Sequence, residues 1–316
     1  MSLQVENMNK NTAKDSEQQG EDCLKTSCIF CKFKPNYLDA IPFFQKASDS
    51  YHGSKDWQNE IKSRINLTKC FRETNSHWEE GNEYEKIAKI RLNQLSLSDE
   101  ALLDIQNAHN AYFTQREYES SIKCLVTLSE DYTQRSEFDY AERCLKTAYE
   151  AIQKIFHVVC MKKDTEPISY VYKCIEAYID VLIRNNKEES SAEILNNMVK
   201  LIRDEDADNK EQIEKFYVIL LGVYIILGEE KNFNDLVEIV EGGSNLRMIQ
   251  KIKKSINDKD EKDFKNNLDD AEYVLPGQMC KKIRGIFKSS LPKQEDMIIQ
   301  TNDIKLNAED TDSDLR

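Results

Sequence analysis

Glycine and proline, the residues that most often interrupt helices, are scarce in this chain, with nine glycines and five prolines among 316 residues. Alternation of polar and apolar residues with period two is rare as well, so we expect almost no β-sheet. The longest apolar run, Phe216 to Leu227, is too short to span a bilayer and predicts a buried helix. These absences predict an all-α protein with long helices and short turns.

The sequence also lacks the common marks of catalysis. It contains no phosphate-binding loop, no dinucleotide-binding glycine pattern and no nucleophile elbow. The four histidines, His52, His77, His109 and His157, show no metal-ligand spacing. A formal net charge of −13 disfavours nonspecific binding to nucleic acid. We therefore expect no enzyme, no cofactor, no metal and no nucleic-acid partner.

The expected location follows from the first residues and the cysteines. The first twenty residues are polar, so we expect no secretory signal peptide and a cytoplasmic protein. Five cysteines lie in helical patterns and are expected to be small buried thiols. These five are Cys70, Cys124, Cys144, Cys160 and Cys174.

One helical pattern occurs four times. It has an aromatic residue, a small residue three positions later, a bulky or soft residue at six and an apolar residue at ten. These offsets lie on or near one stripe of an α-helix, where the small residue lets a neighbouring helix approach. A period of about forty residues is typical of tandem antiparallel helix hairpins. The four segments are Tyr37-Ala40-Phe43-Ala47, Trp78-Gly81-Tyr84-Ala88, Tyr118-Ser121-Cys124-Leu128 and Phe138-Ala141-Cys144-Ala148.

Composition predicts five segments and a tetratricopeptide-like solenoid of antiparallel helix hairpins. Pro42 lies inside the first repeat, so the first helix either bends there or starts near Ile41. The segments are a disordered N-terminal tail at 1–22, an apolar and basic loop at 23–35, the solenoid at 36–229, a C-terminal helical bundle at 230–290 and an acidic flexible tail at 291–316.

The loop contains Cys23, Cys28 and Cys31 at the spacing of three ligands in plant-type iron–sulfur proteins. A cluster needs a fourth ligand, and the next cysteine is Cys70, on a predicted helix. Thiols without a function are therefore the favoured interpretation, with reversible acylation of Cys28 or Cys31 as an alternative.

Apolar residues of the same loop stand among lysines. An apolar segment ringed by positive charge suits an anionic membrane surface. The alternative is that these side chains pack on the first hairpin. The predicted membrane contacts are Ile29, Phe30, Lys32, Phe33 and Lys34.

The acidic end of the chain has two interpretations. Many solvated termini are acidic, but Leu315 stands alone among aspartates and has the character of a docking residue. Charge on Asp312 and Asp314 would steer an approach, and the leucine would anchor it.

Three features together resemble the SNAP family, the soluble attachment proteins for the N-ethylmaleimide-sensitive fusion ATPase. The segment FCKFKPNYLDAIPFFQKASDSY, Phe30 to Tyr51, is similar to the gamma-type opening. The register of about forty residues fits the family's layout. The basic helix CKKIRGIFK, Cys280 to Lys288, followed by a terminal Asp314-Leu315-Arg316, is similar to the alpha-type end. The resemblance covers roughly residues 28–316.

This resemblance implies an adaptor without catalytic residues, cytoplasmic and peripheral on membranes. It would bind assembled SNARE complexes (syntaxin-type proteins) and recruit the hexameric ATPase that takes them apart. Asp312, Asp314 and Leu315 would contact the ATPase, and the loop with Ile29 and Phe30 would contact the bilayer. The alternative is a tetratricopeptide-like scaffold that binds other proteins, although no carboxylate clamp is visible at successive repeats.

Overall fold

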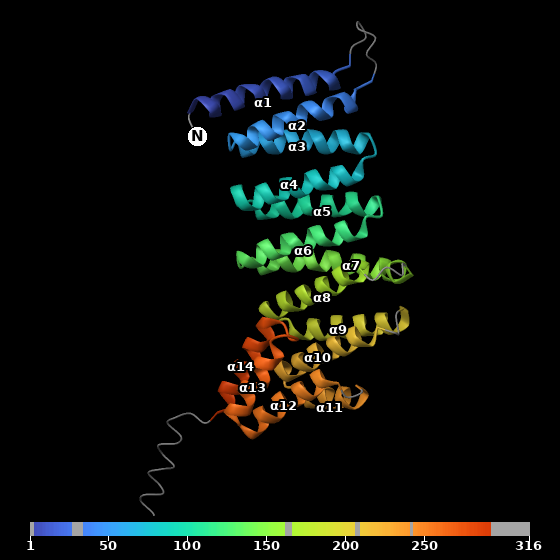
Figure 1. The fold of residues 1–316 in the computed structure, drawn as a ribbon, viewed down its shortest axis with the longest axis vertical. Helices are drawn as coiled ribbons and strands as arrows, with labels where there is room; N and C mark the ends of the chain where they lie inside the picture. Colours follow the sequence, from blue (N-terminus) through green and yellow to red (C-terminus); the bar gives the residue numbers. More distant parts are fainter. Residues whose placement is uncertain (1–2, 27–33, 162–165, 206–208, 241–242, 292–316) are drawn as a thin grey trace, which may run out of the picture. The chain divides into compact units, whose positions relative to one another are not determined.

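The computed structural model describes residues 3–26, 34–161, 166–205, 209–240 and 243–291 (Figure 1). These parts of the chain form fourteen α-helices and contain no strand, which confirms the all-α prediction. The chain divides into two compact units, Met1–Val181 and Leu182–Arg316. The boundary between the units falls inside the eighth helix.

The first unit contains seven complete helices and most of the eighth. Neighbouring helices pack in chain order from the first to the seventh, as in a stack of antiparallel hairpins. The helices are α1 Leu3–Leu24, α2 Tyr37–Gly53, α3 Trp57–Glu73, α4 His77–Leu95, α5 Ser98–Thr114, α6 Tyr118–Gln134, α7 Phe138–Met161 and α8 Glu166–Arg184.

The small residues of the repeated pattern lie where close helix packing requires them. Ala40, Ser121 and Ala141 are completely buried. At Gly81 of α4, a Cβ atom would come within 2.9 Å of the Tyr112 ring of α5. A side chain at this position would therefore push α5 away, which explains why the pattern has a small residue three positions after its aromatic.

Five of the hairpin turns in the first unit share one backbone device. A residue with a left-handed backbone conformation follows each helix, and the amide of the next residue donates back to a carbonyl in the last turn. In four of the five turns this carbonyl lies five residues earlier, as Ser76 N donates to Phe71 O at 2.8 Å. These positions are not glycines, so the scarcity of glycine does not prevent sharp turns. The residues are Lys55, Asn75, Ser96, Arg116 and Ser136; at Ser96 the returning bond, from Leu97, spans six residues, to Arg91.

Helix α1 corrects the prediction of a disordered tail at 1–22. Its buried positions are small or polar, including Ala13, Ser16 and Gly20, so its sequence lacks an apolar stripe. The small side chains let α1 approach α2 closely; a Cβ on Gly20 would lie 2.9 Å from the Phe44 ring. Packing against a partner helix, rather than its own hydrophobicity, stabilises this segment.

The helix that contains Pro42 begins at Tyr37 and continues through the proline to Gly53. Of the two alternatives, a start near Ile41 is wrong. Asn36 caps the helix, because its side chain accepts a hydrogen bond from the Asp39 amide at 3.2 Å.

The second unit is a helical bundle organised around α10, which packs against α9, α11, α12 and α14. Nine residues of α10 between Phe216 and Ile225 are buried. This helix is apolar on all sides because other helices pack against several of its faces. The helices are α9 Glu188–Glu205, α10 Lys210–Leu227, α11 Glu230–Ile239, α12 Ser244–Asp258, α13 Glu261–Ala271 and α14 Gly277–Ser290.

Ion pairs, a ring stack and buried apolar side chains hold the last helix in this bundle. Lys282 of α14 pairs with Glu188 at the start of α9, and also donates to Asn186 Oδ1 at 2.9 Å. The Phe264 and Phe287 rings stack with centroids 4.0 Å apart. Within the described residues, no helix has the length and apolarity needed to cross a membrane.

Candidate functional site

Most residues predicted to contact a membrane or an ATPase lie outside the described part of the chain. This applies to Cys28 and Cys31 as well. Lys34 is described and exposed, three residues before α2 begins. The predicted contacts outside the described residues are Ile29, Phe30, Lys32, Phe33, Asp312, Asp314 and Leu315.

The described thiols lie mostly in the interior. Cys23, the first cysteine of the proposed cluster motif, packs at the end of α1 against a core that includes Phe44 and Cys70. Burial raises the pKa of the Cys70 thiol to about 11 and that of Cys174 to about 12. Cys160 is only half-buried, so four of the five predicted buried thiols are confirmed. The described residues contain no group of three or more potential metal ligands.

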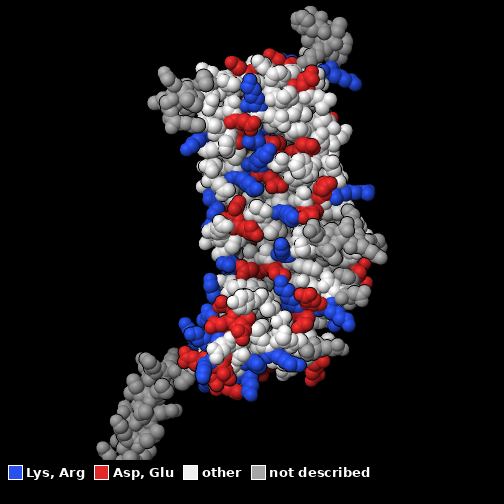
Figure 2. Space-filling model, in the orientation of Figure 1, with Lys and Arg blue, Asp and Glu red and all other residues white. Residues whose placement is uncertain are grey.

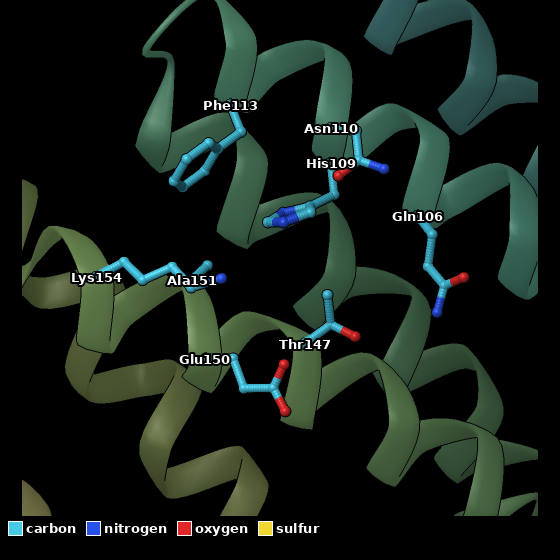
Figure 3. A pocket seen from close by; sticks show the side chains of 8 residues that line it. All are labelled: Gln106, His109, Asn110, Phe113, Thr147, Glu150, Ala151 and Lys154. Carbon is cyan, nitrogen blue, oxygen red and sulfur yellow. The ribbon is translucent and has the colours of Figure 1, made fainter.

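A groove lies between α5 and α7, the next-but-one neighbours in the hairpin stack (Figure 3). Its volume is about 300 Å³. Figure 3 shows Gln106 and His109 projecting from α5 toward α7, with Thr147 and Glu150 on the opposite wall. The wall from α5 consists of Gln106, His109, Asn110 and Phe113, and the wall from α7 of Thr147, Glu150, Ala151 and Lys154.

The inner end of the groove is fixed by His109, which is almost completely buried. Its Nδ1 atom lies 2.7 Å from Ser121 Oγ and 3.1 Å from the Ser121 carbonyl oxygen, on α6. The Ser121 hydroxyl also donates to the His109 backbone carbonyl oxygen at 3.2 Å, so several contacts hold His109 against α6. Burial lowers the pKa of His109; the hydrogen bond with Ser121 opposes this shift, and the nearby Lys154 charge adds to it.

The outer walls of the groove carry polar side chains with no committed partner. Gln106, Asn110, Glu150 and Lys154 form no side-chain hydrogen bond or ion pair with another described residue. Gln106 is half-buried, and the other three are exposed. The groove therefore presents two amides, one carboxylate and one ammonium group to a ligand.

The surface around the hairpins has mixed charge. Figure 2 shows acidic and basic side chains interspersed over one face, without a continuous area of one sign. Many of these charges pair within or between helices, as Lys62 does with Glu17 at 3.1 Å. A ligand that depends only on one sign of charge has no broad surface to bind on this face.

The sequence prediction missed the groove. His109 was interpreted as an ordinary helix residue, which its contact with Ser121 fits. The spacings Gln106 to Asn110 and Glu150 to Lys154, each one helical turn, were visible in the sequence. What was not visible is that α5 and α7 approach each other across the intervening α6.

This groove has the walls and uncommitted polar groups of a binding site. The chain matches no protein-family model and no curated protein.

Proposed function

We propose that this protein is an adaptor for SNARE disassembly. It would bind assembled SNARE complexes and recruit and stimulate a hexameric NSF-type ATPase, in vesicle fusion and intracellular transport. The observation that carries the proposal is the run of helices from Tyr37 to Met161, which pack in chain order with the repeated small residues buried. An architecture of this kind is what the resemblance to the SNAP family implies.

The roles of the two ends rest on their residue patterns and on the resemblance. The loop with Ile29, Phe30 and Phe33 would contact the bilayer beside Lys32 and Lys34. Asp312, Asp314 and Leu315 would contact the ATPase, with charge speeding the approach and the leucine anchoring it. Exposed ion pairs contribute about 0–1 kcal/mol each, so the leucine supplies the directional part of the contact.

The test is a SNARE-disassembly assay at limiting adaptor, with a pull-down beside it. We expect the ATPase to be retained by the adaptor only in the presence of SNARE complex. Leu315→Ala should leave SNARE binding intact and strongly lower the disassembly rate. Leu306→Ala, in the same terminal segment, is the matched control and should keep the wild-type rate. A wild-type protein that retains neither SNARE complex nor ATPase would refute the adaptor proposal.

A second candidate is a tetratricopeptide-like scaffold that binds other proteins. The groove between α5 and α7 favours it, because four polar side chains there lack partners among the described residues. The same pull-down separates the two functions, since a scaffold of this kind would ignore SNARE complex and the ATPase.

A further inference from the structure

The groove between α5 and α7 contains two pairs of side chains with matched spacing. Gln106 and Asn110 lie one turn apart on α5, and Glu150 and Lys154 lie one turn apart on α7. Both pairs belong to the first unit, so the site is complete within one compact body. We propose that this groove binds an extended segment of another protein, which carries an acidic and a basic residue two positions apart.

The amide pair favours an extended partner. Each carboxamide offers one acceptor oxygen and an NH₂ donor, which complement the C=O and N–H of a peptide unit. An extended chain leaves these backbone groups free, whereas a helix uses them internally. Because the side chains of Gln106 and Asn110 have no hydrogen-bond partner among the described residues, their carboxamides are available for this pairing.

The charged pair, Glu150 and Lys154, determines which side chains the partner segment must carry. Residues one turn apart on a helix have Cβ atoms about 5–6 Å apart. Residues i and i+2 of an extended chain point to the same side, about 6.6 Å apart. A partner segment can therefore place an acidic side chain against Lys154 and a basic one against Glu150 if these two residues are two positions apart in its sequence. A polyanion is disfavoured, because Glu150 lies one turn from Lys154.

The other residues that line the groove limit the size of the ligand that can bind. Ala151 and Phe113 give apolar contacts, and His109 is locked by Ser121, so the inner wall is preformed. A volume of about 300 Å³ lies at the lower end for ligand sites and suits a few side chains rather than a whole helix. This inference does not depend on the SNARE proposal, since the groove lies within the first unit and its lining is argued without reference to SNARE proteins.

The test uses the full chain and fluorescein-labelled peptides in an anisotropy titration. Two probes carry the spaced pair in either direction, Gly-Val-Glu-Thr-Lys-Val-Gly and Gly-Val-Lys-Thr-Glu-Val-Gly. A third probe has the same composition with Glu and Lys adjacent, which puts them on opposite sides of an extended chain. We expect one spaced probe to bind at least about tenfold more tightly than the adjacent probe, because the latter satisfies only one charge.

Substitutions in the groove test whether the peptide binds there. Asn110→Ala and Lys154→Met should each weaken the spaced probe by about tenfold. Asn107→Ala and Lys146→Met are matched controls on the same two helices, outside the groove, and should bind as wild type. Circular dichroism melts confirm that each variant is folded. SNARE-complex binding is measured in parallel and should not change, which separates this inference from the adaptor proposal.

Two results of the titrations would overturn the inference. One is that no spaced probe binds more tightly than the adjacent probe up to about 1 mM, the weak limit for a specific site. The other is that Asn110→Ala and Lys154→Met bind as wild type. As a check on the wild-type chain itself, a benzophenone-bearing spaced probe should crosslink to α5 or α7, and crosslinking confined to other helices would also contradict the proposal.

Discussion

The first five helices and the second unit bury different kinds of side chain. Among the described residues, every buried charged side chain lies in α1 to α5. The buried polar residues of the second unit are two serines, Ser191 and Ser255. The buried charged residues are Glu17, Glu60, Arg64, Glu80, Glu83 and Asp104.

The charges in the first helices are paired across helices. Arg64 of α3 donates to Glu60 on its own helix at 2.9 Å and to Glu83 of α4 at 2.7 Å. Glu80 of α4 accepts from Arg72 of α3 at 2.7 Å and pairs with His77 at 2.9 Å. Such pairs are directional, so they fix which residues of two helices face each other.

The second unit stabilises its helices by apolar area instead. Leu220 and Leu221 of α10, with Ile249 and Ile252 of α12, are all completely buried. Apolar burial stabilises a fold at roughly 25 cal/mol per Å² without demanding a particular geometry. The difference teaches that hydrophobicity identifies a helix such as α10 from its own sequence, whereas a helix with small and polar buried positions, such as α1, is recognisable only beside its partner.

The largest expected effect comes from removing the guanidinium between two buried carboxylates. Arg64→Met leaves Glu60 and Glu83 without their shared partner, and we expect a loss of about 3–5 kcal/mol in the free energy of unfolding. Urea denaturation of the full chain measures it. The matched control is Lys69→Met, an exposed position on the same helix, which should change stability little.

A combined variant sharpens the comparison. Adding Glu60→Gln and Glu83→Gln to Arg64→Met removes the buried charges together, and we expect part of the lost stability to return. If Arg64→Met alone unfolds at the wild-type urea concentration, these ion pairs do not hold α3 to α4, and the two regions differ less than their interiors suggest.

The second prediction concerns pH. Burial raises the pKa of the Asp104 carboxyl to about 7; Arg91, 3.2 Å away on α4, opposes the shift, and Glu100 adds to it. In the unfolded chain the pKa of this carboxyl is about 3.9. Between these values the folded protein binds more protons than the unfolded one, so this group lowers stability as pH rises toward 7.

Asp104→Asn removes this titration without changing the shape of the side chain. We expect the melting temperature of wild type to fall more between pH 5 and pH 8 than that of the variant. Other carboxylates contribute equally to both proteins, so the difference between the two profiles isolates Asp104. Parallel profiles would mean that Asp104 stays ionised beside Arg91 across this range.

The same contrast explains what the sequence could and could not predict. The apolar run from Phe216 to Leu227 predicted the buried helix α10, and the repeated small residues predicted close packing at Ala40 and Gly81. Helix α1 was missed, because Ser16 and Gly20 look like tail residues until Phe44 is placed against them. The groove was missed because it needs the distance between α5 and α7, which no local pattern contains.

The prediction with the smallest expected effect concerns the contact that holds α1 to α2. The Tyr51 hydroxyl of α2 donates to Glu17 Oε2 at 2.9 Å, in a buried contact. Lys62 still pairs with the same carboxylate at 3.1 Å, so Tyr51→Phe does not leave it alone. We expect a loss of about 1 kcal/mol, the usual contribution of one such hydrogen bond. The change should be local, because Glu17 belongs to the end helix of the stack.

Hydrogen exchange of the α1 amides measures this directly. A loss of about 1 kcal/mol should speed their exchange roughly fivefold. Tyr132→Phe is the matched control, because its hydroxyl donates to the Ser98 carbonyl at 2.6 Å and joins α6 to α5. That variant should leave α1 exchange unchanged. If Tyr51→Phe leaves it unchanged as well, the close packing of Ala13, Ser16 and Gly20 is sufficient to hold α1. The polar contacts of this region would then select the register of the helix without adding to its stability.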